Sequence, residues 1–510
     1  PDRTESCVAV SRLRADGRQT YGPADVRGEL AAYLAGLTAV DDVKVKIDLI
    51  EHAEPDRRAT LTVKFILDGR DRAGAYFQDR FFYRWHLENE APAGAECGWR
   101  IVRDELVEGV RVAGARDGFR AVPPASAGVD YVHARDPHLD PEKCELKFGV
   151  VEHAFGGVSV ADYDGDGRPD VFFPDGVRSR LFKNVTERPG EPRFVDVTDQ
   201  AGLGGIDRAN CALFVDLDND GHKDLMVVRY CAPSLVFRNN GDGTFTDCTR
   251  EMGFDLDAPA LAACALDYDR DGFVDVYVGV YGNAFTDIPR MPFLARNGGK
   301  NRLYRNVGGK RFEDVTDSAG VGDTGWTMAT AAGDLHGSGY PDIVLANDFG
   351  KKTVYRNNGD GTFTETTKQA GTLDFSGGMG VALADFDDDS HLDIYFSNIN
   401  SNQRWFGEDL TVKQYVRNVA RTRWLWKDLS EYRAVYDLVG ADWRELGKRT
   451  GKGNTLYRNR GDGTFEELAG SHTTRAGWGF GVAAFDMDND TDLDVFAANG
   501  WITNVCKDDL

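Results

Sequence analysis

The chain has 510 residues and is strongly acidic, with 83 Asp and Glu residues against 60 Lys and Arg and a formal net charge of −23. This charge argues against a nucleic acid as the partner, and no stretch approaches the ~18 consecutive apolar residues of a membrane-spanning helix. A chain of this length can bury a large core and is expected to hold two domains.

The N-terminal part, residues 1–112, is expected to form a small α+β domain. Apolar residues at helical spacing predict a helix from Tyr21 to Leu37, and alternating apolar residues then predict strands over 43–49, 61–67, 81–87 and from Gly98 onward. A helix against a curved antiparallel sheet resembles the cone-shaped NTF2/SnoaL-like fold, whose members hold a small ligand or only mediate packing. His86 and Asp48 are candidates for lining such a cone, although side chains of this kind are more often satisfied or solvated.

Six copies of one nine-residue pattern dominate the rest of the chain. The first runs from Asp162 to Asp170, and the others start at Asp216, Asp267, Asp334, Asp385 and Asp486. Carboxylates at positions 1, 3, 5 and 9 of such a loop repel one another unless a cation lies among them. Calcium suits these loops because it takes six to eight oxygen ligands in flexible geometry. Acidic β-turns without a metal are the alternative.

The expected calcium ligands include the backbone carbonyl at position 7. They are Asp162, Asp164, Asp166, Arg168 and Asp170; Asp216, Asp218, Asp220, His222 and Asp224; Asp267, Asp269, Asp271, Phe273 and Asp275; Asp385, Asp387, Asp389, His391 and Asp393; and Asp486, Asp488, Asp490, Asp492 and Asp494. The fourth copy has lost two acids, with His336 and Ser338 between Asp334 and Asp342, and is expected to bind weakly or to be empty. About five Ca²⁺ ions are therefore expected. Ser390 and Thr491 replace the turn glycine of two copies.

Each loop lies inside a repeat of about 50 residues that predicts four short antiparallel strands. A strand follows the loop, then a strand such as Leu303-Tyr-Arg-Asn306, then a turn such as Asn240-Gly-Asp-Gly243 and a fourth strand. Such repeats around an axis form the blades of a β-propeller, here with six or seven blades over residues 113–510. The stretch 118–122 with 127–131 resembles a fourth strand, and we expect it to pair with the final blade and close the ring.

The Asp-x-Asp-x-Asp-Gly loops, the Leu-Tyr-Arg-Asn strands and the Gly-Asp-Gly-Thr-Phe turns together resemble FG-GAP/VCBS repeats. These repeats occur in integrin α-subunit heads and in cartilage-acidic-protein-like bacterial proteins, and the match covers about residues 118–510. The resemblance implies a mostly β protein, a propeller with calcium in its blade loops.

An insertion at residues 401–452 interrupts the repeats. It holds 11 Lys and Arg against 7 Asp and Glu, and its apolar spacing predicts helices. Arg417, Arg421, Arg423, Trp424 and Tyr432 form a candidate face for an anionic or aromatic ligand, and the alternative is a packing element between the domains. The shorter insertion from Tyr281 to Lys300 is expected to be a surface loop.

Eight cysteines in a calcium-rich chain fit disulfides in an oxidising compartment. Buried free thiols are the alternative for Cys211 and Cys264, which lie in apolar strands. A start at Pro1 rather than Met is compatible with a processed secreted form or with a shortened chain.

Three functions are compatible with these features. We favour an extracellular or periplasmic, secreted interaction module that presents the propeller to a protein, a glycan or a larger assembly. An enzyme is the second, because the resemblance extends to natural-product pathway enzymes, of which a Friedel–Crafts alkylating enzyme is one example. Its small-molecule site would lie at the domain junction near Arg417, Arg421, Tyr432 and His86. The third is a subunit of a surface complex. The sequence contains no recognisable catalytic motif.

Overall fold

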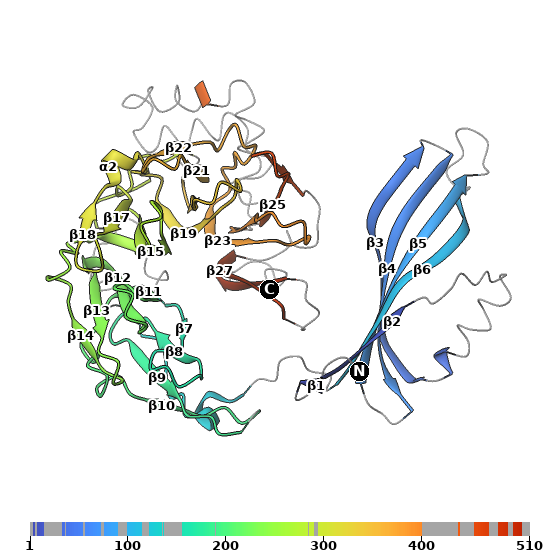
Figure 1. Cartoon of the computed structure of the whole chain (residues 1–510), viewed down its shortest axis with the longest axis horizontal. Coiled ribbons are helices and arrows are strands. Elements are labelled where there is room, and N and C mark those ends of the chain that lie inside the picture. The colour runs from blue at the N-terminus through green and yellow to red at the C-terminus, as the bar shows by residue number, and fades with distance from the viewer. Residues whose placement is uncertain are drawn as a thin grey trace, which may run out of the picture. The chain divides into compact units, whose positions relative to one another are not determined.

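The chain divides into two compact units, residues 1–121 and residues 122–510, which are described separately below (Figure 1). The computed structural model describes residues 4–5, 8–14, 33–35, 37–54, 57–72, 76–89, 99–114, 122–134, 136, 156–188, 190–283, 285–289, 294–399, 437–438, 453–468, 478–487 and 493–501. The boundary after residue 121 lies beyond the expected position 112, because the last strand of the first unit continues to Gly114.

The first unit is built on one antiparallel sheet with the strand order β1-β2-β6-β5-β4-β3. Its strands are β1 (Thr4–Glu5), β2 (Val8–Arg14), β3 (Leu37–Glu54), β4 (Arg58–Asp71), β5 (Tyr76–Asn89) and β6 (Trp99–Gly114). The predicted strands are confirmed. The predicted helix is wrong at its end, because Leu37 begins β3. Tyr33 and Leu34 are helical, and residues 21–32 lie outside the described part.

Aromatic side chains pack along this sheet. Phe65 lies edge-on to Tyr83 and Trp85, with ring centroids 5.3 and 5.6 Å apart. The Tyr33 hydroxyl donates to the buried carboxylate of Asp79. His86, a candidate cavity residue, has its Nδ1 3.2 Å from the Thr60 hydroxyl oxygen. The side chain of Asp48 is outside the described set, and the NTF2-like assignment stays a prediction.

The second unit is a β-propeller whose blades lie side by side around a common centre (Figure 1). Five blades have four antiparallel strands each, and β12 of the second blade also pairs with β15 of the third. The described part of the sixth blade contains the two strands β27 and β28.

The strand bounds follow the repeat closely. The first blade has β7 (Ser159–Ala161), β8 (Asp170–Phe173), β9 (Arg180–Asn184) and β10 (Phe194–Asp196); the second has β11 (Ala209–Val215), β12 (Asp224–Pro233), β13 (Leu235–Asn239) and β14 (Phe245–Asp247); the third has β15 (Asp257–Leu266), β16 (Asp275–Val280), β17 (Arg302–Asn306) and β18 (Phe312–Asp314). The fourth has β19 (Thr327–Gly333), β20 (Asp342–Asn347), β21 (Thr353–Asn357) and β22 (Phe363–Glu365); the fifth has β23 (Gly378–Ala384), β24 (Asp393–Asn398), β25 (Thr455–Asn459) and β26 (Phe465–Glu467); the sixth has β27 (Trp478–Phe485) and β28 (Asp494–Trp501). A short helix, α2 (Thr316–Ala319), follows β18.

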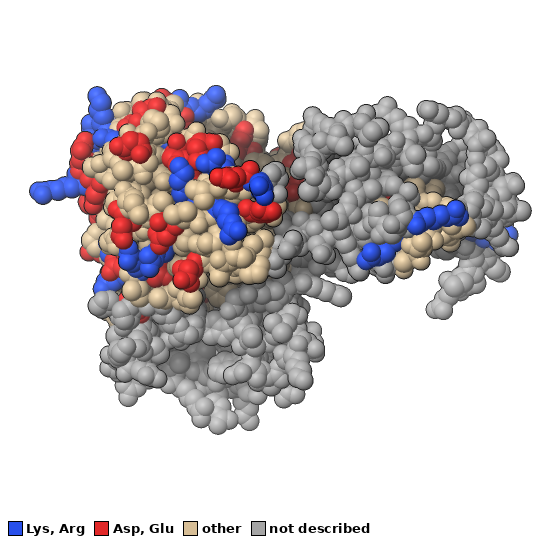
Figure 2. Space-filling model, turned by 90° about the horizontal axis from the view of Figure 1, so that it is seen from below, with Lys and Arg blue, Asp and Glu red and all other residues tan. Residues whose placement is uncertain are grey.

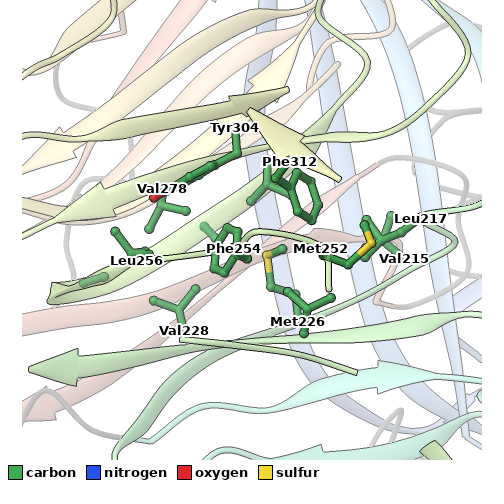
Figure 3. Close-up of a cluster of buried hydrophobic side chains, with 14 of the residues drawn as sticks. Val215, Leu217, Met226, Val228, Met252, Phe254, Leu256, Val278, Tyr304 and Phe312 are labelled. Carbon is green, nitrogen blue, oxygen red and sulfur yellow. The ribbon is translucent and has the colours of Figure 1, made fainter. Parts of the chain in front are cut away.

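The hydrophobic core of the propeller lies mainly between neighbouring blades. Figure 3 shows one such layer, in which Met226 and Val228 of the second blade face Phe254, Val278 and Tyr304 of the third blade and of its approach. Similar layers join the first blade to the second, the third to the fourth and the fourth to the fifth. Because apolar faces are buried only against a neighbour, each blade depends on the next one for its stability.

The segment before the first blade differs in part from the prediction that residues 118–122 and 127–131 form a ring-closing strand. Residues 124–127 form a 3-10 turn, η1 (Pro124–Ala127), and residues 128–131 form no strand. Pro123 and Pro124 lack backbone N–H groups and so cannot donate to a strand ladder. Gly128, with φ +79°, faces the Phe194 carbonyl as Gly202 faces that of Phe245 in the next blade. The turn therefore occupies the position that follows a fourth strand, and residues 118–121 lie outside the described part.

The blade topology separates the acidic loops from the insertions. The nine-residue loops connect first to second strands, whereas the segments 281–301 and 399–454 connect second to third strands. Because neighbouring strands are antiparallel, these two kinds of connection leave the blades at opposite ends. Any ligand face formed by the insertions is thus distinct from the acidic loops.

The described cysteines differ from the disulfide prediction. Cys211, Cys231, Cys248 and Cys264 are free. Burial raises the pKa of Cys248 to about 11 and that of Cys264 to about 12, so both stay protonated and pack as small apolar groups. The other four, Cys7, Cys97, Cys144 and Cys506, lie outside the described residues.

An asparagine at the end of the third strand connects each of the second to fifth blades to the preceding one. The Asn306 side-chain amide donates to the Leu217 carbonyl of the second blade at 2.7 Å and to Val274 at 3.1 Å. The Asn239, Asn357 and Asn459 amides make the same pair of bonds in their blades. This contact is buried and repeats around the propeller, so it fixes how far each blade is rotated from the next.

We predict that Asn306→Ala lowers the free energy of unfolding by about 2–3 kcal/mol, because it leaves buried carbonyls without donors. Asn240→Ala is the matched control, since among the described residues its side-chain amide bonds only the exposed hydroxyls of Thr244 and Thr246, and we expect a change within about 0.5 kcal/mol. Urea unfolding at constant calcium measures both. Equal effects of the two substitutions would show that the asparagine contact does not connect the blades.

Candidate metal centre

The first five loops adopt one backbone conformation. Positions 4 and 6 have positive φ in each of them, as in Gly165 and Gly167 of the first loop and Asn219 and Gly221 of the second. Glycine adopts this region without strain, whereas side chains with a Cβ are disfavoured there by about 1 kcal/mol. In the fifth loop Asp388 and Ser390 have φ values of 58° and 70°. The fifth loop thus keeps the common shape at a cost in backbone strain.

The aspartate at position 1 organises the loop around its carboxylate. In the first loop the two Asp162 oxygens accept the N–H groups of Asp166 and Gly167 at 3.0 and 2.8 Å. Asp216, Asp267, Asp334 and Asp385 accept the same two N–H groups in their loops. The side chain at position 5 accepts the N–H at position 7, for example His222 to Asp220 at 2.8 Å. The backbone N–H groups of the turn therefore hold the side-chain oxygens of positions 1 and 5 on the inside of the loop.

The aspartate at position 9 is buried and ties three elements together. Asp275 accepts the Tyr268 N–H at 3.1 Å and the Asn306 N–H at 2.7 Å, and its residue is fully buried. The same two bonds occur at Asp170, Asp224, Asp342 and Asp393. Burial raises the pKa of Asp275 to about 7 and the pKa values of Asp170, Asp224 and Asp393 to about 6. The neighbouring loop carboxylates raise these pKa values further.

Carboxylates gather closely enough in four loops to hold one ion. The groups are Asp162, Asp164 and Asp166; Asp216, Asp218 and Asp224; Asp267, Asp269 and Asp271; and Asp385, Asp387 and Asp393. In each group the ligand oxygens lie within 4.8 Å of one another. These are four of the five loops in which the sequence analysis expected full sites. Of the sixth loop only the ends are described, with Asp486 and Asp494, while Asp488, Asp490 and Asp492 lie outside.

Two buried carboxylate oxygens fit a bound cation as their partner. Asp164 Oδ1 and Asp218 Oδ1, both at position 3, are inaccessible to solvent and accept no hydrogen bond from the described residues. A buried acceptor without a donor is costly, and a calcium ion among the loop oxygens would satisfy it. The donor set is made of oxygens only, which is the set that calcium prefers.

A basic residue from the third strand also reaches these loops, which the sequence analysis missed. Arg238 Nε lies 3.1 Å from Asp218 Oδ2, Arg305 Nε lies 2.7 Å from Asp269 Oδ2, and Arg458 Nε lies 2.6 Å from Asp387 Oδ2. Lys183 pairs with Asp164 in the first loop. The signal was present in the sequence, because Arg or Lys precedes the third-strand Asn in each of these blades. One positive charge offsets only part of the negative charge of the loop carboxylates. The loop therefore still favours a divalent cation.

The fourth loop differs as its sequence suggests. His336 replaces the acid at position 3, and its Nδ1 lies 2.6 Å from Asp342 Oδ2. Arg356, which corresponds to Arg305, has no ion pair with this loop among the described residues. Ser338 occupies position 5 and accepts the Tyr340 N–H. The fourth loop therefore keeps its shape through hydrogen bonds and lacks the crowded carboxylates of the others.

The second candidate ligand face belongs to the insertion at residues 401–452. Arg417, Arg421, Arg423, Trp424 and Tyr432 lie outside the described residues, and of the insertion 401–452 only Asp437 and Leu438 are described.

Elsewhere on the propeller, Figure 2 shows acidic and basic side chains interleaved over the face that it presents. No helix in the described part of the chain is long and apolar enough to cross a membrane.

A family comparison agrees with this geometry. The model of the FG-GAP-like repeat matches residues 162–227, 216–278, 293–345, 334–396 and 437–497, which is more than half of the chain. The chain belongs to the FG-GAP-like repeat family. Each matched segment contains one or two of the acidic loops and the strands around them. The fold and the family that the sequence indicated are thus confirmed.

Cartilage acidic protein 1 is a curated relative of this FG-GAP-like protein. The mouse (Mus musculus) and human (Homo sapiens) proteins are each 26% identical over 403 residues, covering 71% of this chain and 59% and 58% of theirs. The chain thus spans about three fifths of their length. Among solved structures, an Agrocybe aegerita lectin that recognises non-reducing terminal N-acetylglucosamine matches with a TM-score of 0.34 and 17% identity, covering 87% of this chain and 86% of that one.

We predict that Ser390→Gly raises the free energy of unfolding by roughly 0.5–1 kcal/mol, because it removes the strain of a side chain at positive φ. Gly221→Ala is the reverse change at the same position of the second loop, where an added Cβ would meet nothing within 4 Å. It is expected to lower stability by about 1 kcal/mol through the backbone alone. Urea unfolding of both variants in saturating calcium provides the measurement, and a loss of stability in Ser390→Gly would contradict the backbone account.

A second prediction concerns pH. The raised pKa values mean that the metal-free native state holds protons which the unfolded chain releases near pH 4. The metal-free fold therefore loses stability as pH rises from about 4 to 7, and calcium gains affinity as the same carboxylates ionise. The increase in Tm produced by calcium should be clearly larger at pH 7.5 than at pH 5. An equal increase at both values would exclude these carboxylates as ligands.

Proposed function

We propose that this protein is a calcium-stabilised propeller that acts outside the cytoplasm, in the extracellular or periplasmic space, as an interaction module. Membership of the FG-GAP-like repeat family supports an interaction module in general. The calcium part is carried by one observation: one buried oxygen each of Asp164 and Asp218, inside groups of three carboxylates, accepts no hydrogen bond from the described residues. The proposed partner is a protein, a glycan or a larger assembly.

Calcium would act here as a structural ion. The position-9 aspartates join the loop to the third strand, and the third-strand asparagines join one blade to the next. Neutralising the loop charge therefore stabilises the contact between blades as well as the loop. The side chains of each of the four carboxylate groups would hold one ion. The role of these ions would be structural and not catalytic.

The proposed location follows from the chemistry of the sites. Exposed loops of this kind, with no helix to frame them, resemble the weaker calcium sites that extracellular modules use at about 10⁻⁴–10⁻³ M. Such sites fill where calcium is abundant and stay largely empty in the cytoplasm. Of the free thiols, Cys248 is buried and Cys211, Cys231 and Cys264 are half-buried, and such thiols are compatible with an oxidising compartment.

The test compares two substitutions with and without a chelator. EDTA should lower the Tm by many degrees, because an ion that binds only the folded state stabilises it. Asp218→Ala should remove part of this calcium-dependent increase, since it deletes a charged ligand with an unpartnered oxygen. Ser338→Ala in the fourth loop is the matched control and should leave the increase unchanged. If EDTA does not change the Tm, or if the two variants respond alike, calcium is not the stabilising ion.

A further inference from the structure

A hydrogen bond joins the second acidic loop directly to the third. The side-chain amide of Asn219, at position 4 of the second loop, donates to the carbonyl of Gly272, at position 6 of the third loop, at 2.9 Å. Each of these loops contains a group of three carboxylates. We propose that this bond couples the two calcium sites, so that an ion bound in one loop strengthens calcium binding in the other. The coupling rests on the calcium sites of the proposed function and adds how two of them act on one another.

The bond connects the ligands of the two sites in a few steps. Asn219 follows Asp218, which belongs to the carboxylate group of the second loop. On the other side, the Gly272 N–H donates to Asp267 Oδ2 at 3.1 Å, and Asp267 belongs to the carboxylate group of the third loop. An ion that fixes Asp267 therefore also fixes Gly272, whose carbonyl is the acceptor for Asn219.

The third blade also packs directly against the second loop. A Cβ added at Gly309, in the turn after β17, would lie 2.7 Å from the Asp218 Cα, so the two backbones are in close contact. The Asn306 side-chain amide donates to the carbonyl of Leu217 in the second loop at 2.7 Å. These contacts limit how far the second loop can move without the third blade.

The coupling has a physical cause in the ordering of the loops. Without an ion, the repulsion between carboxylates disfavours the compact form of each loop. The first ion holds one loop compact, and the bond from Asn219 to Gly272 transmits part of this order to the neighbouring loop. The second ion then loses less conformational entropy on binding, which is positive cooperativity. By linkage, each site strengthens the other by the same factor.

The neighbouring loop boundaries lack an equivalent bond. Gly165 and Gly337 occupy position 4 of the first and fourth loops and have no side chain that could reach the next loop. Arg270 occupies this position in the third loop and lies over the Tyr340 ring of the fourth loop, 5.2 Å from its centroid. The fourth loop, however, has lost two of its acids. Among the described residues, a direct bond between two carboxylate-rich loops therefore occurs at the boundary between the second and third blades.

The experiment titrates the metal-free full chain with Ca²⁺ and follows hydrogen exchange in each loop. Replacing Asp267 and Asp269 together by Asn disables the third site. The calcium concentration that protects residues 216–224 by half should then rise about fivefold, at the lower end of the range for coupled sites. The midpoint for residues 385–393 in the fifth loop should stay unchanged, because the fourth loop separates them from the third. This loop controls for a general loss of stability.

Two substitutions at position 4 test the role of Asn219. Asn219→Gly removes the bond and keeps the loop shape, since Gly adopts the φ of 61° without strain. In this background, disabling the third site should no longer raise the midpoint for residues 216–224. Arg270→Gly is the matched control, because Arg270 has a φ of 58° at the same position and contacts the fourth loop instead. The fivefold shift should persist in Arg270→Gly.

The reciprocal variant keeps the test decisive if the third-loop variant fails to fold. Replacing Asp216 and Asp218 together by Asn should raise the midpoint for residues 267–275 by the same factor. An unchanged midpoint in the partner loop, equal shifts in the second and fifth loops, or a shift that persists in Asn219→Gly would overturn the coupling and leave the calcium sites in place. If Ca²⁺ protects none of the loops, the proposed function and the coupling are both wrong.

Discussion

The propeller depends on a buried aspartate at the end of each of the first five acidic loops. Its two oxygens accept N–H groups from the loop and from the third strand, as Asp275 does from Tyr268 and Asn306. The same asparagine then bonds the preceding blade through Leu217. One carboxylate thus links a loop, a strand and a neighbouring blade. Burial raises the pKa of Asp275. The contact that holds the blades together therefore depends on the protonation state of this carboxylate.

Two kinds of positive charge are available to balance these loops. The chain supplies one basic residue to most of them, such as Arg305 beside Asp269. The basic residue reaches one oxygen of the position-3 carboxylate, and in the first two loops the second oxygen stays buried without a donor. A calcium ion accounts for that second oxygen. The fourth loop supports this division of roles, because it has lost the acid at position 3 and pairs His336 with Asp342 instead.

The sequence predicted the repeated features well and the unrepeated ones poorly. Each strand and loop recurs several times, so the blade pattern, the four full carboxylate groups and the atypical fourth loop could all be read from spacing. The end of the N-terminal helix was wrong because Leu37 fits the periodicity of a helix and of a strand equally well. The role of Arg238 was missed because its partner Asp218 lies 20 positions away, and no local pattern links them. Residues 127–131 were read as part of a fourth strand, although they follow the turn at Pro124 and form no strand.

The most direct test of this account is the calcium content of the purified native protein at neutral pH, measured by elemental analysis after equilibrium dialysis against calcium well above ~10⁻³ M, with the calcium of the dialysate subtracted. The account predicts four or five calcium ions per chain, and the loss of one ion when Asp267 and Asp269 are both replaced by Asn. A protein that retains its fold with no bound calcium would contradict it. In that case the basic residues and backbone donors alone would have to balance the clustered carboxylates.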